Sequence, residues 1–290
     1  MERQLWKSIV EILKALDKPH GSVRLKYSDE WIVAVWYWSV IHDRPLSWAV
    51  IKGHWPLDLR KRQLPSNSRM SVRLRSPSVR ALLQAVERRV VAPPEPGMYW
   101  IVDGKSMPIG GCSKDRQAGY GRAAGGHARG YKLHAIVGGN GSIGAWRIAP
   151  MNVDERVMAR RMIRNTPLQG YLLGDGNYDS NPLHDACGED LQLVTPRRSG
   201  GRRGLGRHRH SPHRLRSVTL TEDPLCQFGR DLLKHRFQIE QTFGHLTNWG
   251  GGLNGLPAWV RTHRRVHRWV QDKLVITALK RRLAIRTYAA

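Results

Sequence analysis

The sequence predicts an α/β protein in which helices flank a mixed sheet, preceded by a small all-α N-terminal domain. Three observations predict this class. Apolar residues recur at helical spacing in the first ninety positions, a break rich in Pro and Gly follows at residues 92–97, and short apolar runs then alternate with helical patterns. The chain of 290 residues is long enough to bury a core without disulfides or a structural metal.

The N-terminal domain, residues 1–92, is expected to be helical and to recognise DNA. An amphipathic helix is predicted near residues 1–13, and Ser28 with two following acids predicts the start of a buried helix over residues 31–41. Pro45 predicts the first residue of the next helix and Ser66 the cap of the one after it, while a further helix covers residues 78–90. Short helices joined by a turn are typical of a helix-turn-helix, although surface arginines on such helices are also common without a DNA role. The expected DNA contacts here are Arg69, Arg73 and Arg75.

The second domain, residues 98–290, is expected to contain the sheet. Strands are predicted at residues 98–103, 131–137 and 145–148, with a hairpin signal at residues 138–141 and a Gly-rich stretch at residues 110–130. A helix at 154–163, a strand at 171–174, a helix at 182–187 and a strand at 191–195 follow. Residues 197–216 hold many arginines and no acid, which predicts a mobile basic loop, and two helical patterns cover residues 228–248 and about 261–286.

The charge balance indicates a polyanionic partner. Lys and Arg number 48 against 23 Asp and Glu, which gives a net charge of +25 and favours double-stranded DNA over a neutral metabolite. A membrane surface is the competing polyanion, but the best apolar run, residues 31–41, is about half of the roughly 20 residues that a spanning helix needs. The first residues do not fit a secretory signal, so a cytoplasmic protein is expected. The three cysteines show no paired motif and are expected to be reduced.

Three acids are candidates for chemistry. Asp103 and Asp175 each close a predicted strand and precede a glycine, and strand ends are where polar groups gather at the edge of a sheet. Glu240 lies at the border of an apolar helix stripe, four residues after Arg236. Ordinary turns and a surface ion pair are the alternative explanations. Gathered carboxylates become useful when two Mg²⁺ ions bind them, because two such ions can catalyse displacement at phosphorus.

Five segments together resemble, in order, the pattern of bacterial insertion-sequence transposases of the DDE type. They are residues 101–104 (IVDG), 130–134 (GYKLH), 150–154 (PMNVD), 174–180 (GDGNYDS) and 236–243 (RFQIEQTF). The resemblance implies a ribonuclease H-like fold in which Asp103, Asp175 and Glu240 bind two Mg²⁺ or Mn²⁺ ions. It further implies that water cuts DNA at the transposon end, that the freed 3′ hydroxyl attacks target DNA, and that a homodimer acts on the two ends.

Several details depart from the resemblance or leave alternatives open. Many relatives have Tyr and Lys where this chain has Leu233 and Thr247, so a hairpin DNA intermediate is not implied. A decayed copy that binds DNA without cutting, a metal-dependent nuclease without strand transfer and a basic RNA-binding protein are the alternatives.

Further DNA contacts are expected from basic or aromatic residues near the acids, in the basic loop and on the basic C-terminal helix. Arg236 is also expected to contact a phosphate or to orient Glu240. The others are Lys105, Lys132, Tyr178, Arg202, Arg203, Arg207, Arg261, Arg264, Arg265 and Arg268.

Overall fold

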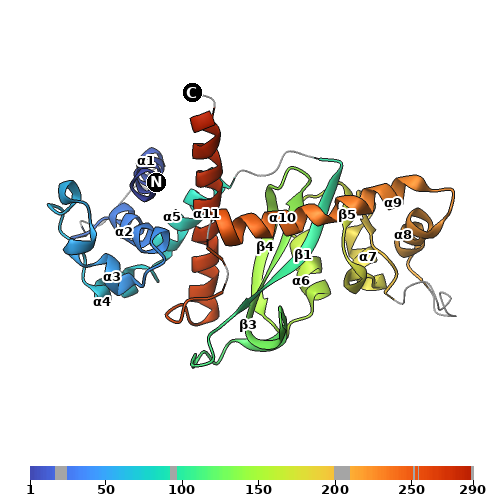
Figure 1. The fold of residues 1–290 in the computed structure, drawn as a ribbon, viewed down its shortest axis with the longest axis horizontal. Helices are drawn as coiled ribbons and strands as arrows, with labels where there is room; N and C mark the ends of the chain where they lie inside the picture. Colours follow the sequence, from blue (N-terminus) through green and yellow to red (C-terminus); the bar gives the residue numbers. More distant parts are fainter. Residues whose placement is uncertain (17–24, 92–96, 199–209, 251, 254, 289–290) are drawn as a thin grey trace. The chain divides into compact units, whose positions relative to one another are not determined.

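The computed structural model describes residues 1–16, 25–91, 97–198, 210–250, 252–253 and 255–288 (Figure 1). Arg202, Arg203 and Arg207 of the expected basic loop lie outside the described residues. The chain divides into two compact units. Unit 1 comprises Met1–Ala92, Leu246–Leu253 and Arg268–Ala290, and unit 2 comprises Pro93–His245 and Asn254–His267.

Unit 1 is a helical bundle built around an almost completely buried helix, α2. Residues 32–40 of α2 are all buried, which follows from their continuous apolar character, and the Trp6 indole N–H donates to the Ala34 carbonyl at 2.9 Å. Ser28 and Ser66 cap α2 and α4 as predicted, by accepting backbone N–H groups. Pro45 precedes α3 rather than beginning it. The helices are α1 (Glu2–Ala15), α2 (Asp29–Ile41), α3 (Leu46–Ala49), α4 (Asn67–Arg73) and α5 (Pro77–Val90), with 3-10 turns at Lys52–His54 and Leu57–Leu59.

The C-terminal helix α11 (His263–Tyr288) belongs to unit 1 from Arg268 onward, whereas the sequence placed it in the second domain. Buried polar contacts explain the difference. Asp272 accepts the Trp36 indole N–H at 2.5 Å, Lys273 pairs with Asp43 at 2.5 Å, and Trp269 packs edge-on against Trp36. The helix is rich in basic residues, but one of its faces is buried in unit 1.

Unit 2 contains a mixed sheet in the strand order β4-β3-β1-β5-β6, with β2 paired to the beginning of β3. β1, β5 and β6 run parallel, and β3 is antiparallel to both β1 and β4. This order and these directions define a ribonuclease H-like sheet, as expected. The strands are β1 (Tyr99–Pro108), β2 (Gly119–Ala123), β3 (Gly126–Gly138), β4 (Ile143–Pro150), β5 (Gly170–Leu173) and β6 (Leu191–Val194).

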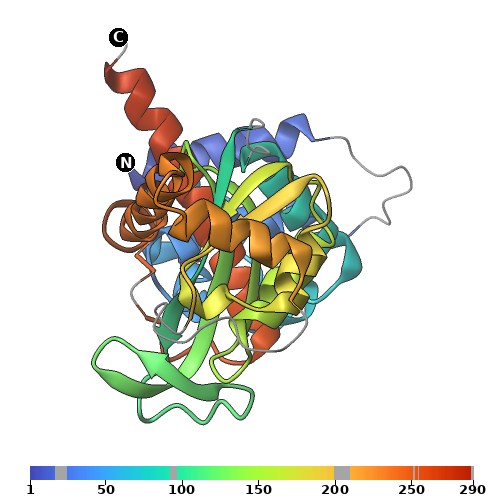
Figure 2. The same cartoon turned by 90° about the vertical axis from the view of Figure 1, so that its right-hand side faces the viewer.

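Strands β1 and β3 are longer than the sequence indicated. The predicted first strand ended at Asp103, but β1 continues to Pro108 because β3 pairs with it from Gly130 to Gly138. Beyond that point β3 pairs with β2, so part of the Gly-rich stretch forms a β-hairpin, which extends away from the rest of the sheet in Figure 2.

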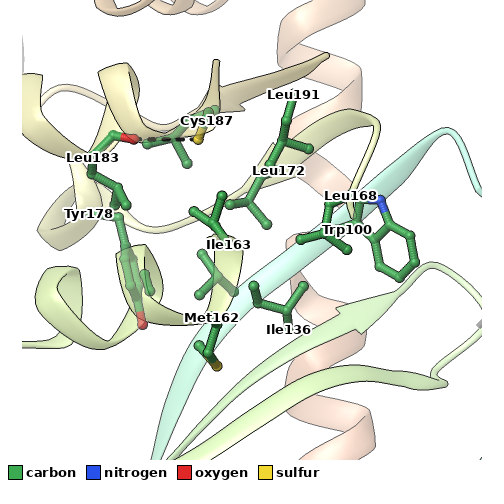
Figure 3. Packing of buried hydrophobic residues seen from close by; sticks show 13 residues of the cluster. Trp100, Ile136, Met162, Ile163, Leu168, Leu172, Tyr178, Leu183, Cys187 and Leu191 are labelled. Carbon is green, nitrogen blue, oxygen red and sulfur yellow. Dashed lines mark hydrogen bonds between the residues drawn. The ribbon is translucent and has the colours of Figure 1, made fainter. Parts of the chain in front are cut away.

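One face of the sheet is covered by α6 (Glu155–Ile163) and α7 (Asn181–Cys187). Figure 3 shows the core between them, where Trp100, Ile136 and Leu172 of the sheet meet Met162 and Ile163 of α6. The even-numbered side chains of β1 face this core, so its odd-numbered side chains, including Asp103, face the opposite side.

The remaining elements complete unit 2. α8 (Pro212–Glu222) lies along the edge strand β6, where Thr195 N–H donates to Ser217 at 3.2 Å and the Gln192 amide donates to the His213 carbonyl at 3.0 Å. The long helix predicted at 228–248 is divided into α9 (Gln227–Lys234), a 3-10 turn (His235–Phe237), α10 (Gln238–Gly244) and a π-helical turn (His245–Gly250). From Leu246 onward this turn belongs to unit 1. In the described part of the chain, no helix combines the length and apolar character needed to cross a membrane.

Candidate active site

Asp103 and Asp175 lie next to each other, just beyond the point where the pairing of the neighbouring strands β1 and β5 ends. In the parallel strands β1 and β5, Ile101 pairs with Leu173. Asp103 comes two residues after Ile101, and Asp175 comes two residues after Leu173. The Asp103 carboxylate accepts the Gly104 N–H at 2.7 Å, and Asp175 caps the following 3-10 turn by accepting the Asn177 N–H at 2.9 Å. The topology therefore brings together two acids that are 72 positions apart in the sequence.

The surroundings of Asp103 raise its pKa from 3.8 to about 6. Burial is the largest cause, the carboxylates of Glu155 and Asp175 add to it, and the Gly104 N–H and the Arg236 charge oppose it. The carboxyl group is therefore largely buried, with the carboxylates of Glu155 and Asp175 close enough to act on it. Such a site favours a bound cation.

Glu155 is the carboxylate that sequence reasoning missed. It lies in the first turn of α6 and forms an ion pair with the buried Lys132 of β3. A Cβ at Gly104 would lie 3.5 Å from Glu155 Oε1 and 2.7 Å from Lys132 Cδ, so only glycine leaves room for this pair beside Asp103. One sequence signal was available: Glu155 directly follows Asp154, which caps α6 shortly after the end of β4.

Tyr178 packs in the core rather than presenting its ring to solvent. Its side chain is 1% exposed, and its ring lies beside α7 in the cluster of Figure 3. Burial raises its pKa well above 10, and the charges of Glu155, Asp103 and Asp175 add to this effect. The buried ring is therefore not available to stack on a base. Its hydroxyl lies close enough to Glu155, Asp103 and Asp175 to be affected by their charges.

Helix α10 approaches the aspartates from the other face of the sheet. The Tyr99 hydroxyl of β1 donates to Gln238 Oε1 at 2.9 Å, and the positive charge of Arg236 lowers the pKa of Asp103. Glu240 follows Arg236 by one helical turn, and its side chain is exposed. Within the described residues, no three His, Cys, Asp or Glu side chains form a group that could hold a metal ion. The charges of Asp175, Glu155 and Arg236 thus act on Asp103, and the expected triad of Asp103, Asp175 and Glu240 does not form a metal-holding group among these residues.

Of the other expected DNA contacts that the structure describes, three have partners within the protein, one is half-buried and the rest are exposed. Lys132 is paired as described, Arg73 pairs with Asp29 and donates to the Tyr27 carbonyl at 3.0 Å, and Arg268 donates to the Leu74 carbonyl at 2.8 Å. These three side chains have structural partners, which differs from the solvent-facing role expected for them. Lys105 is half-buried, and burial lowers its pKa. The exposed group comprises Arg69, Arg75, Arg261, Arg264 and Arg265.

The sheet order and the paired aspartates define a ribonuclease H-like domain with an acidic site at one edge of its parallel strands. Residues 99–270, more than half of the chain, match the family profile described as a transposase DDE domain, and the chain belongs to this family. Among solved structures, a piggyBac transposase in a synaptic complex with hairpin DNA is similar at 11% identity and a TM-score of 0.40, covering 95% of this chain and 72% of that chain. No curated protein sequence matches.

Proposed function

We propose that the protein is a transposase that cuts transposon ends and joins the freed 3′ hydroxyl to target DNA. Asp103 and Asp175 carry this proposal, because each lies two residues beyond the last pair of the parallel strands β1 and β5 in a domain of the DDE family. The net charge of +25 supports duplex DNA as the partner. The exposed Arg69 and Arg75 support a role for unit 1 in recognising the ends. Because two ends are cut, we further propose a homodimer on DNA.

The donor set at the site fits a hard divalent cation. Two carboxylates lie side by side on neighbouring strands, and carboxylate oxygens are the ligands that such a cation prefers. Two bound Mg²⁺ or Mn²⁺ ions would supply activation of the attacking oxygen and stabilisation of the leaving oxygen. We propose Glu240 as the third ligand when DNA is bound, because it follows one helical turn after Arg236, whose charge acts on Asp103.

The other side chains near the site have positioning roles in this proposal. Arg236 contacts the scissile phosphate from the 3-10 turn (His235–Phe237) that precedes α10. Lys132 holds Glu155 against Gly104, which keeps this third carboxylate beside Asp103 through a buried ion pair. Because Lys132 pairs with Glu155, its charge does not occupy the Asp103 carboxylate, which stays available to a cation.

The test is the cleavage of an end-containing duplex by Asp103→Asn and Asp175→Asn variants in Mg²⁺. Each substitution should lower cleavage at least about 100-fold, because the site supplies several kcal/mol of charge stabilisation, while DNA binding stays within about twofold. Asp231→Asn, at an exposed carboxylate of α9, is the matched control and should cleave normally. Normal cleavage by either site variant would overturn the proposed site.

Two further readouts separate the alternatives. Glu240→Gln should abolish cleavage if Glu240 is the third ligand, whereas loss in Glu155→Gln with normal cleavage by Glu240→Gln would assign that role to Glu155. A target plasmid in the same reaction reports strand transfer. Cleaved ends without joined product would show a nuclease, and uncut DNA bound by the natural chain would show a binding protein only.

A further inference from the structure

The β2–β3 hairpin has one polar, aromatic face and one face of small residues. Tyr120 pairs with Arg129 and Arg122 pairs with His127, so these four side chains share a face. Tyr120 is 70% exposed, Arg122 and His127 are exposed, and the Arg129 guanidinium lies 6.0 Å from the Tyr120 ring centre. This face therefore presents an aromatic ring together with positive charge.

The opposite face fixes the hairpin against the body of unit 2. A Cβ at Gly119 would lie 2.0 Å from Asn152 Oδ1, and one at Gly121 would lie 2.5 Å from the Met151 carbonyl oxygen. The Ser106 hydroxyl donates to the Arg122 carbonyl at 2.9 Å. The glycines therefore allow a close approach that holds the exposed face in one orientation.

The positive charge of this region is not neutralised internally. Asp115 is the one acid of residues 110–130, and it is buried, where it accepts the Tyr131 hydroxyl at 2.9 Å and the Thr262 N–H at 2.7 Å. Arg122 and Arg129 form no ion pair with any described residue. The contact of Asp115 with Thr262 also brings the start of α11, with the exposed Arg264 and Arg265, to this part of the sheet.

We propose that this hairpin is a DNA-binding ribbon that guides the duplex to the aspartates. The inference rests on the proposed function, because its partner is the DNA that the site would cut. Arg129 lies on the same face of β3 as Ala135, which pairs with Asp103, because residues of one strand alternate between faces. A two-stranded ribbon fits the major groove of DNA, and arginines beside a tyrosine supply phosphate and base contacts.

The register gives the ribbon a position along the duplex. Six residues separate Arg129 from the Asp103 partner Ala135, which is about 20 Å along β3 at roughly 3.3 Å per residue. At about 3.4 Å per base pair, the ribbon contacts DNA roughly six base pairs from the scissile phosphate. This distance is a specific consequence of the strand pairing.

The experiment measures duplex DNA binding by fluorescence anisotropy over a salt series, with the full chain and without divalent cations. Replacing both Arg122 and Arg129 with Ser should lower the slope of log affinity against log salt by about two, since each phosphate contact contributes about 0.9. Arg161→Ser with Arg164→Ser, two exposed arginines near the end of α6, removes equal charge and should leave the slope within half a unit. Tyr120→Ala should weaken binding several-fold with the slope unchanged, because its contact is not ionic.

A hydroxyl-radical footprint of a cleavable end locates the contact. The Arg122 and Arg129 double variant should lose protection about six base pairs from the cut, and only there. An unchanged slope in this variant would overturn the proposed DNA-binding ribbon, as would the same loss of slope in the α6 control. The same series with an RNA duplex is a further test, since a loss of slope seen only with RNA would also overturn the proposal. Since binding is measured without catalysis, failure of cleavage in every variant would refute the proposed function and leave this result intact.

Discussion

At the scale of single residues, Asp272 is the most unusual group of unit 1. Its carboxylate is fully buried between α11 and α2, where the Trp36 indole N–H donates to it. Burial raises its pKa from 3.8 to about 7, although Trp36, Tyr37 and Arg268 each favour the charged form. The group therefore remains partly protonated at neutral pH.

This pKa predicts that unit 1 loses stability as the pH rises. The unfolded chain releases the Asp272 proton near pH 4 and the folded chain near pH 7, so the folded state binds more protons in that range. The free energy of unfolding should fall by as much as about 1.4 kcal/mol per pH unit from this group. Asp272→Asn should remove this dependence and raise the Tm at pH 8 relative to the natural chain.

Thermal unfolding followed by tryptophan fluorescence between pH 5 and 8 measures the effect. Most tryptophans lie in unit 1, including Trp36 next to Asp272. The exposed Asp58 provides a control, since Asp58→Asn should leave the pH dependence of the natural chain in place. Parallel pH curves for Asp272→Asn and the natural chain would contradict the buried titration.

At the scale of elements, α9 packs against the end of α8 at a position that requires glycine. A Cβ at Gly229 would lie 2.1 Å from the Leu220 carbonyl oxygen, which is backbone and cannot move aside. Gly244, at the end of α10, has no atom within 4 Å of its Cβ position. The two glycines therefore occupy helices for different reasons.

Alanine should have opposite effects at these two glycines. Gly229→Ala should destabilise unit 2 by roughly 1–3 kcal/mol, because overpacking displaces α9 from α8. Gly244→Ala should stabilise by up to about 1 kcal/mol, since alanine favours the helix and meets open space. Chemical denaturation followed by circular dichroism compares them. Equal effects of the same sign would show that helix propensity, rather than the approach to Leu220, decides both.

The sequence predicted the elements of the fold better than the full set of site residues. Helix caps such as Ser28 are local signals, and the apolar runs that Asp103 and Asp175 close made the two acids candidates for one site. The spatial order of the strands, which places the two acids side by side, depends on long-range pairing that the runs do not encode. Glu155 reaches them through the packing of α6 on the sheet, which no spacing encodes. The hairpin was missed because glycines interrupt its apolar alternation, although residues 124–127 (AGGH) contain a Gly-Gly turn signal.

At the scale of the whole molecule, unit 1 is assembled from both ends of the chain. Trp269 and Asp272 of α11 are buried in it, and Arg268 closes contacts with Leu74 and the Trp36 ring. Residues 1–92 alone therefore lack part of their own core. A recognition domain drawn only from the N-terminal sequence would be incomplete.

Truncation tests this assembly. Ending the chain after His267 should abolish cooperative unfolding of unit 1 and shift its tryptophan fluorescence to the red, because loss of Trp269 and its neighbours opens a large cavity. Ending the chain after Arg282 keeps those residues and should preserve the transition. A cooperative transition of natural amplitude in the shorter chain would show that residues 1–92 fold without α11.

The helix that lies along β6 also decides how copies of this protein can associate. Strand edges are the usual sites where one chain adds to the sheet of another. Here the Ser217 hydroxyl and the Gln192 side chain tie α8 over that border. A partner molecule therefore cannot lengthen the sheet at β6, and any association of copies uses a different surface of the chain.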